Sequence, residues 1–239
     1  MNINRNNREH LGAERPQQVR KIGTTRRSVS GFFMFRGKKS IPYESALERD
    51  LLIRLSHNRL VNDIIAQPLQ LKYEASNGNE YPYTPDYLIY YQLEKSTPLE
   101  DLSVPMLVEV KYRQELQEKW LKLKPKFKAA RKYATEQGWT FKIYDELRIR
   151  DQVWRNIMFL QRYKRMEFDP EETKWILDNM RFMGQATFDY ILTRHFFDKW
   201  DRAVGISHVW HLLSTGAIDC DMSLPLNDFT ELWVADYDE

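Results

Sequence analysis

The chain has 239 residues, a formal net charge of +2 and 42% hydrophobic residues. This length suffices for one large or two small domains with a proper core. No apolar run approaches the length that spans a bilayer, and the single cysteine, Cys220, excludes an internal disulfide and a cysteine-based zinc cluster. We therefore expect a cytoplasmic protein with no membrane partner, in which Cys220 is a small packing residue.

The first 40 residues are predicted to form a basic N-terminal arm. Ten lysine and arginine residues against two glutamates give residues 1–40 a net charge of +8, which leaves 2 − 8 = −6 for the remainder. Such an arm is suited to contact with DNA phosphates or with the minor groove, because binding releases counterions in a manner that depends on salt. A disordered, solubilising tail explains residues 1–18 almost as well, whereas basic residues interleave with phenylalanines between residues 20 and 39. The candidate DNA contacts in the arm are Arg26, Arg27, Lys38 and Lys39.

A helix is predicted over residues 43–57, where leucines recur at helical spacing. Glu48 falls inside this leucine stripe, and a lone carboxylate that faces a core is costly unless it is paired or binds a metal. We interpret Glu48 as a candidate metal ligand. The alternatives are a buried salt bridge, or a position at the margin of the stripe that reaches solvent. The stripe consists of Leu47, Leu51, Leu52 and Leu55.

Residues 69–74 and 81–92 are predicted to be the two strands of a β-hairpin. The turn sequence Ser-Asn-Gly-Asn at residues 76–79 lies between them. Within the second segment, Asp86 directly follows Pro85 and precedes an aromatic, β-branched run. This order indicates that the Asp86 carboxylate lies at the entrance of a strand and not in a loop.

The strand predicted over residues 105–112 carries Glu109 and Lys111. Side chains alternate along a strand, so these two share a face while Val108 and Val110 point to the opposite, buried face. With the preceding aspartate they bring two acids and one amine to the edge of a sheet. That combination suits Mg²⁺-assisted cleavage of a phosphodiester, with Mn²⁺ as a substitute. An isolated match of this kind is more often an edge strand with a solvated charged face.

A basic helix is predicted over residues 119–137, with Pro125 in its first turn and Gly138 as its stop, followed by a strand over residues 139–144. This helix would lie across one face of the sheet with its cations near the DNA, although a merely solvated face is an equal alternative. Residues 41–150 therefore form an α/β domain with a mixed central sheet flanked by helices. The candidate DNA contacts on the helix are Lys126 and Arg131.

The remaining segment, residues 151–239, is predicted to be mainly helical. Asp169 and Pro170 mark a helix start, with a cap residue and a proline at the first position. Three helices followed by a short β-ribbon indicate a winged-helix domain, and the acidic ribbon favours contact with protein, or packing between domains, over contact with phosphate. The predicted helices cover residues 153–166, 170–182, 185–197 and 203–214, and the strands cover 217–221 and 230–233.

The order of these motifs resembles the TnsA endonuclease subunits of heteromeric DNA transposases. The likeness covers nearly the whole chain from about residue 20, and its Pro-Asp…Glu-x-Lys core is that of the restriction-endonuclease-like nucleases. The segments that carry it are SALERD at 45–50, QPL at 67–69, TPDY at 84–87, VEVK at 108–111 and GWTFKI at 138–143.

The resemblance implies a Mg²⁺-dependent endonuclease that cuts the non-transferred (5′) strand at transposon ends in a bacterial cell. It implies double-stranded DNA as the substrate and two partners, a TnsB-like DDE transposase and a TnsC-like AAA+ regulator. A stand-alone restriction- or repair-type nuclease and a non-cutting DNA-bound scaffold remain the alternatives. The implied catalytic residues are Glu48, Asp86, Glu109 and Lys111, and the implied metal ligands are Glu48, Asp86, Glu109 and the carbonyl of Val110.

Overall fold

A computed structural model describes residues 16–19, 29–92, 104–196 and 199–235. The chain divides into two compact units, Met1–Ile149 and Arg150–Glu239. Among the described residues, none of the helices combines the length and the apolar character needed to cross a membrane. The candidate DNA contacts Arg26 and Arg27 lie outside the described residues.

The first unit is built on a mixed four-stranded sheet with the strand order β3-β6-β7-β8. Strand β6 pairs antiparallel with both β3 and β7, whereas β8 pairs parallel to β7. A parallel pair needs a crossover connection, which helix α2 supplies here. The α/β prediction of a mixed sheet flanked by helices, as in restriction endonucleases, is confirmed. The strands are β3 (Val61–Ala66), β6 (Tyr87–Tyr91), β7 (Met106–Val110) and β8 (Thr140–Tyr144).

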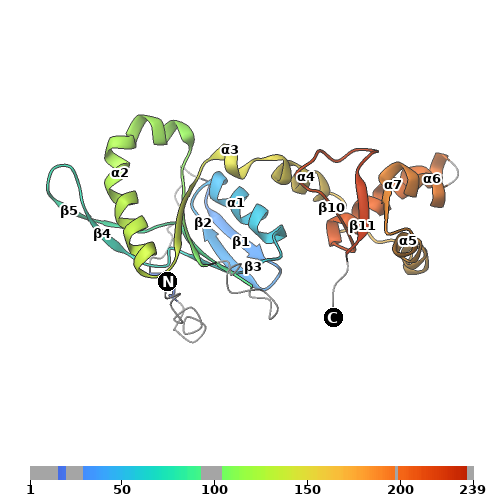
Figure 1. The fold of residues 1–239 in the computed structure, drawn as a ribbon, viewed down its shortest axis with the longest axis horizontal. Coiled ribbons are helices and arrows are strands. Elements are labelled where there is room, and N and C mark those ends of the chain that lie inside the picture. The colour runs from blue at the N-terminus through green and yellow to red at the C-terminus, as the bar shows by residue number, and fades with distance from the viewer. Residues whose placement is uncertain (1–15, 20–28, 93–103, 197–198, 236–239) are drawn as a thin grey trace, which may run out of the picture. The chain divides into compact units, whose positions relative to one another are not determined.

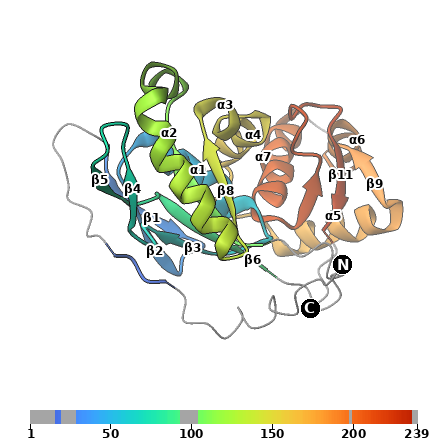
Figure 2. The ribbon, with the colours of Figure 1, turned by 60° about the vertical axis from the view of Figure 1, so that its left-hand side comes forward.

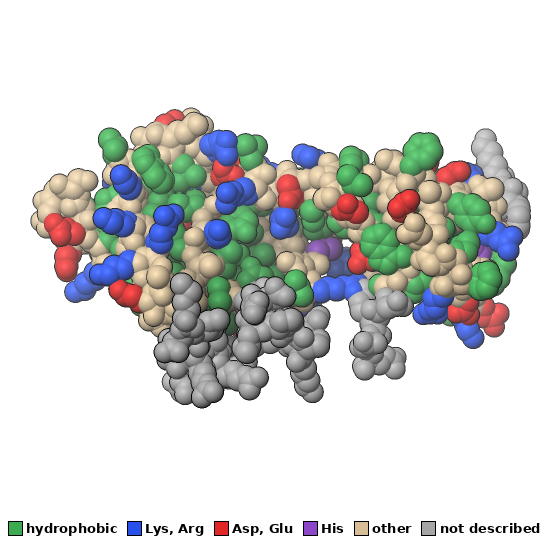
Figure 3. All heavy atoms as spheres, in the orientation of Figure 1, with side chains coloured by type: hydrophobic (Ala, Val, Ile, Leu, Met, Phe, Trp, Pro, Cys, Tyr) green, Lys and Arg blue, Asp and Glu red, His purple; other side chains and the backbone are tan. Residues whose placement is uncertain are grey.

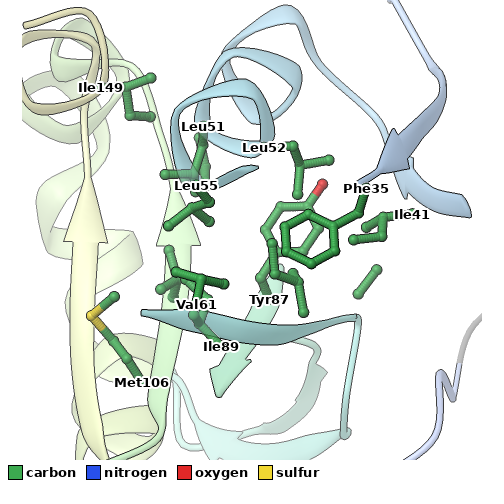
Figure 4. Packing of buried hydrophobic residues seen from close by; sticks show 14 of the residues in the cluster. Phe35, Ile41, Leu51, Leu52, Leu55, Val61, Tyr87, Ile89, Met106 and Ile149 are labelled. Atoms are coloured by element: carbon green, nitrogen blue, oxygen red, sulfur yellow. The ribbon is translucent and has the colours of Figure 1, made fainter. Parts of the chain in front are cut away.

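Helices α1 (Ala46–His57) and α2 (Arg113–Glu136) cover opposite faces of this sheet (Figure 2). Successive residues of β7 alternate between the two cores, because strand side chains alternate between faces. Val108 packs in the core that contains α1, and Leu107 packs in the core that contains α2. Figure 4 shows the first of these cores, with the α1 leucines above the side chains of the sheet. The residues labelled there include Leu51, Leu52, Leu55, Val61, Tyr87 and Ile89.

Two β-hairpins extend the first unit beyond the central sheet. The predicted turn at residues 76–79 does join a hairpin, β4 (Leu71–Glu74) with β5 (Glu80–Tyr83), and Gly78 adopts a φ of 77° that the turn requires. The prediction of one strand over residues 81–92 is wrong. Strand β5 pairs with β4, while β6 pairs with β3 and β7, so residues 84–86 form a break between two sheets.

Sequence reasoning missed three strands of this unit. Strands β1 (Gly31–Phe35) and β2 (Lys39–Tyr43) form a hairpin within and just beyond the segment predicted as an arm, and β3 is the edge strand of the central sheet. Phe35 and Ile41 of this hairpin are buried in the core beneath α1. Their burial anchors this hairpin to the core of the unit.

Helix α2 begins at Arg113 and has 24 residues, so Pro125 lies inside it and not in its first turn as predicted. A proline inside a helix removes one hydrogen bond and bends the helix, and Figure 1 shows α2 bent. Packing of its apolar side on the sheet holds the two halves in one helix. The buried residues of α2 are Leu123, Phe127, Ala130 and Ala134.

The second unit combines helices with a three-stranded antiparallel sheet of strand order β10-β11-β9. Asp169 caps α5 with Pro170 at its first turn, as predicted. Strand β9 lies where the sequence predicts the start of a helix. The winged-helix identity of this unit stays a prediction. Its elements are α4 (Gln152–Leu160), α5 (Pro170–Met183), β9 (Gln185–Thr187), α6 (Phe188–His195), α7 (Lys199–Thr215), β10 (Ile218–Cys220) and β11 (Glu231–Val234), after the short α3 (Glu146–Ile149) that ends the first unit.

Cys220 is buried in the core of the second unit, as predicted for a packing residue. Burial raises the pKa of its thiol to about 12, since the thiolate would lose its hydration. The thiol is therefore protonated at neutral pH and does not provide a nucleophile.

We expect Leu52→Ala to lower the free energy of unfolding by about 2–5 kcal/mol, because the Leu52 side chain is fully buried between α1 and the sheet. Leu121→Ala is the matched control, since Leu121 is 82% exposed on α2 and its truncation should change stability by less than about 0.5 kcal/mol. Denaturant unfolding measures both. Equal losses in the two variants would contradict the assigned core.

Candidate functional site

The charged residues singled out from the sequence gather where β6 begins and β7 ends. These strands are antiparallel, with Tyr87 opposite Val108, so the start of one lies beside the end of the other. The Asp86 backbone N–H donates to the Val108 carbonyl at 3.1 Å, and the Val110 N–H donates to Asp86 Oδ2 at 2.6 Å. Asp86 is thereby fixed beside the last residue of β7, one residue before Lys111.

Glu109 is the most buried acid of the group, with an exposed fraction of 1%. Its Oε1 lies 2.9 Å from Lys126 Nζ and 3.4 Å from Lys111 Nζ, and its Oε2 accepts a hydrogen bond of 2.6 Å from the Tyr83 hydroxyl. The contact with Lys111 agrees with the alternation that puts both side chains on one face. Both oxygens of Glu109 are therefore engaged by groups of the chain itself.

Glu48 approaches the site from α1 and also stabilises the start of that helix. The Glu48 N–H donates to Ser45 Oγ at 3.1 Å, and Glu48 Oε2 accepts from the Glu44 N–H at 2.9 Å. This arrangement is a variant of the capping box, because the Glu48 side chain reaches the N–H one residue before the cap residue Ser45 and also accepts from the Ser45 hydroxyl at 2.8 Å. Tyr87 of β6 donates a further hydrogen bond of 3.2 Å to Glu48 Oε2. Helix capping therefore explains why a glutamate occupies position 48, and neither the buried salt bridge nor the solvent-exposed margin considered from the sequence included this role.

Electrostatic interactions join the three acids and Lys111 in one cluster. Burial, and next the negative charge of Glu109, raise the pKa of Asp86 well above its usual value, and the charge of Glu48 acts in the same direction. Burial also raises the pKa of Glu48, although hydrogen bonds from Glu44 and Ser45 and the charge of Lys111 oppose this shift. The ionised form of both carboxylates is therefore disfavoured in this environment.

Lys111 is the cation that all three acids share. Burial alone would lower the pKa of Lys111, but the charges of Asp86 and Glu109 outweigh this effect and raise it above its usual value. Lys111 consequently carries a full positive charge at neutral pH. An ammonium in this state can orient a water molecule or stabilise an anion, but it does not accept a proton.

The donor set has the chemistry that Mg²⁺ prefers, because carboxylate and carbonyl oxygens are its usual protein ligands. In the described part of the chain, no three acidic, histidine or cysteine side chains are already arranged as metal ligands. Asp86 and Glu48 nevertheless lie close enough for the charge of one to raise the pKa of the other, and a divalent cation would relieve that repulsion. Residues suited to the metal are therefore Glu48, Asp86 and the Val110 carbonyl, with Glu109 beside them and already paired.

The candidate DNA contacts are distributed unevenly. Lys38 lies exposed in the turn between β1 and β2, and Lys39 Nζ pairs with Asp63 Oδ1 at 2.6 Å. Arg131 is exposed on α2, whereas Lys126 turns inward to Glu109. Figure 3 shows blue side chains spread over the part of the first unit where α2 lies. The exposed basic residues of this helix include Lys119, Lys122, Lys124, Lys128, Arg131 and Lys132.

Sequence reasoning missed three residues of the site, Ser45, Tyr83 and Tyr87, and it assigned a fourth, Lys126, to DNA contact and not to the pairing with Glu109 that the structure shows. Ser45 has a local signal, since Ser-x-x-Glu at residues 45–48 is the pattern of a capping box. Tyr83 and Lys126 have no such signal, because they reach Glu109 across 26 and 17 residues of sequence. Tyr87 belongs to a motif quoted above, but nothing local indicates its hydrogen bond to Glu48.

Family models match most of the chain. The model described as TnsA-like endonuclease N terminal matches residues 58–146, and the model described as TnsA endonuclease C terminal matches residues 148–222. No curated protein matches the chain.

We expect Ser45→Ala to destabilise the first unit by about 1 kcal/mol, because it removes the acceptor for the Glu48 N–H at the start of α1. Ser45→Thr should restore most of the loss, since threonine keeps a hydroxyl that caps the helix and can donate to Glu48 Oε1. Ser56→Ala in the last turn of the same helix is the control. Denaturant unfolding compares the three variants, and a Ser45→Ala variant as stable as the wild type would contradict the capping role.

We expect Asp86→Asn to raise the stability of the metal-free protein at pH 7. The folded-state pKa of Asp86 is raised, so the titratable carboxyl costs stability above the pKa of the unfolded chain, and this cost grows with pH until the folded-state pKa is passed. The gain should vanish as the pH falls below about 3.9, where an unfolded aspartate is itself protonated. Denaturant unfolding with a chelator present measures it, with Glu80→Gln on the surface as the control. A loss of stability at pH 7 would contradict the electrostatic assignment.

Proposed function

Because the chain belongs to the TnsA endonuclease family, we propose that it is the Mg²⁺-dependent endonuclease subunit of a transposase and cuts the non-transferred (5′) strand at transposon ends. The observation that carries this proposal is the meeting of three acids from three elements near one lysine. Asp86 Oδ2 accepts from the Val110 N–H at 2.6 Å, Glu109 Oε1 lies 3.4 Å from Lys111 Nζ, and the charge of Glu48 acts on both Asp86 and Lys111. Glu48 comes from α1, Asp86 from the start of β6 and Glu109 from the end of β7. Carboxylates that bind a metal, with an ammonium beside them, are the groups that metal-assisted hydrolysis of a phosphodiester requires.

We assign each residue a role from its position. Asp86 and Glu48 would hold the metal directly or through water, and the Val110 carbonyl and Glu109 would complete the ligand set. Bound Mg²⁺ supplies an activated water and offsets charge on the phosphate. Lys111 orients the attacking water or stabilises the charge that develops on the phosphate, which agrees with its raised pKa.

We further propose that cutting takes place in a complex on double-stranded DNA with a TnsB-like DDE transposase and a TnsC-like AAA+ regulator. The family assignment supports this, because a subunit that cuts only one strand needs a partner for the other. The sequence has no phosphate-cradling glycine loop, which agrees with a regulator that brings the ATP. The exposed basic side of α2 supplies suitable charge for the DNA backbone.

The test is cleavage of a labelled transposon-end duplex by the full chain with its partner transposase and Mg²⁺. Wild type should nick the strand that the transposase leaves intact, and Asp86→Ala or Lys111→Ala should lower the rate by at least about 100-fold, the scale for loss of an essential charge at a reacting phosphate. Lys142→Ala, which removes an exposed lysine of β8, should leave the rate unchanged. Chelation of Mg²⁺ should stop cleavage and Mn²⁺ should restore it.

The other outcomes favour the alternatives. Cleavage by the purified chain without a transposase favours a stand-alone nuclease. DNA binding without cleavage under any condition favours a scaffold. Equal rates for wild type, Asp86→Ala and Lys111→Ala would show that the site is wrongly assigned.

A further inference from the structure

A second lysine, Lys126, reaches the candidate site from α2, on the face of the sheet to which Glu109 points. Its Nζ lies 2.9 Å from Glu109 Oε1, a shorter separation than the 3.4 Å to Lys111 Nζ. The pair spans 17 residues and joins α2 to β7. Lys126 is thus the nearer of the two ammonium groups that neutralise Glu109.

The surroundings of Lys126 differ from those of the exposed lysines on α2. Its side chain is only 16% exposed, and its ammonium lies over the rings of Tyr83 and Phe127, 4.7 Å and 5.1 Å from their centroids. An ammonium that leaves water in this way needs a carboxylate or an aromatic face to offset the lost hydration. Lys126 has both a carboxylate and aromatic rings around its ammonium, so its position is fixed by specific contacts and is not that of a solvated surface side chain.

Three donors from three elements therefore hold the Glu109 carboxylate. Lys126 comes from α2, Tyr83 from the end of β5, and Lys111 from the residue after β7. Lys126 and Tyr83 take one oxygen each at hydrogen-bonding distance, while Lys111 is also drawn by the charge of Asp86. If Lys126 were absent, Lys111 would be the only ammonium that the described contacts give to Glu109.

We propose that Lys126 is a positioning residue of this site, and that it is the internal cation with which a divalent metal competes for Glu109. This inference rests on the proposed function for its consequence in cleavage. With Tyr83, Lys126 fixes the Glu109 carboxylate and offsets part of its charge, so that Glu109 holds Lys111 less tightly, at 3.4 Å, and Lys111 can also interact with Asp86 and the phosphate. The same contact lowers the net negative charge that a metal ion meets.

Removal of the Lys126 charge should then move two quantities in opposite directions. The affinity for a divalent metal rises, because one competing positive charge leaves the cluster. Cleavage slows, because Glu109, left with a single ammonium partner, holds Lys111 more tightly and shifts it away from the reacting phosphate. A lysine that only supports the fold would weaken both quantities, and a lysine that only contacts DNA would change neither metal affinity nor turnover.

The test uses the full chain with Lys126→Met, Lys126→Arg and the control Lys142→Met. Titration with Mn²⁺ alone, followed by calorimetry without DNA, should give a dissociation constant about 5- to 10-fold lower in Lys126→Met than in the wild type. In the cleavage assay the same variant should lose about tenfold in kcat, with an unchanged KM for DNA. Lys126→Arg, which keeps the charge, should restore both values to within about threefold, and Lys142→Met should match the wild type.

Weaker or unchanged Mn²⁺ binding in Lys126→Met would overturn the proposal, as would a raised KM for DNA with an unchanged kcat. If Lys126→Met fails to fold, Tyr83→Phe decides, since it removes the other close donor to Glu109. It should lower kcat by about threefold at constant KM, and an unchanged kcat would overturn the proposal. A wild-type protein that never cuts DNA would refute the proposed function, whereas the Mn²⁺ titration would still decide the role of Lys126.

Discussion

The pairing of one buried carboxylate with two ammonium groups is the interaction on which this site depends. Glu109 is almost fully shielded from water, and a carboxylate in that position is tolerated only when its charge is matched. Lys126 and Lys111 supply the match, and Tyr83 satisfies the remaining oxygen. Because these two lysines neutralise Glu109, Asp86 and Glu48 are the acids of the site whose negative charge a bound cation would stabilise.

The sheet explains how groups from distant segments meet at one point. Alternation along β7 directs Val108 to the core under α1 and Glu109 to the side covered by α2. Glu48 reaches the site from α1, Lys126 reaches it from α2, and the strand ends between the helices carry the other charges. The layered α/β architecture therefore does more than bury apolar surface, because it brings charges from both faces to a single edge.

Two residues of the site serve structure and chemistry together. Glu48 caps α1 through the Glu44 N–H and accepts a hydrogen bond from Tyr87, so its carboxylate is held before any metal binds. Asp86 accepts the Val110 N–H, yet its pKa stays raised because its carboxylate is buried and the charges of Glu109 and Glu48 lie nearby. Repulsion between these carboxylates lowers the free energy of unfolding of the metal-free protein, and a bound cation would raise it again.

The sequence by itself determined the features that depend on neighbouring residues. The leucine stripe of α1, the turn at residues 76–79 and the spacing of Glu109 and Lys111 all follow from local periodicity or turn chemistry. Only the tertiary structure decided that residues 81–92 divide between two sheets, that α2 begins before Pro125, and that Lys126 turns inward with Tyr83. Strand partners and the buried side of a helix are set by the sum of many weak contacts between distant segments, and no short stretch of sequence contains that sum.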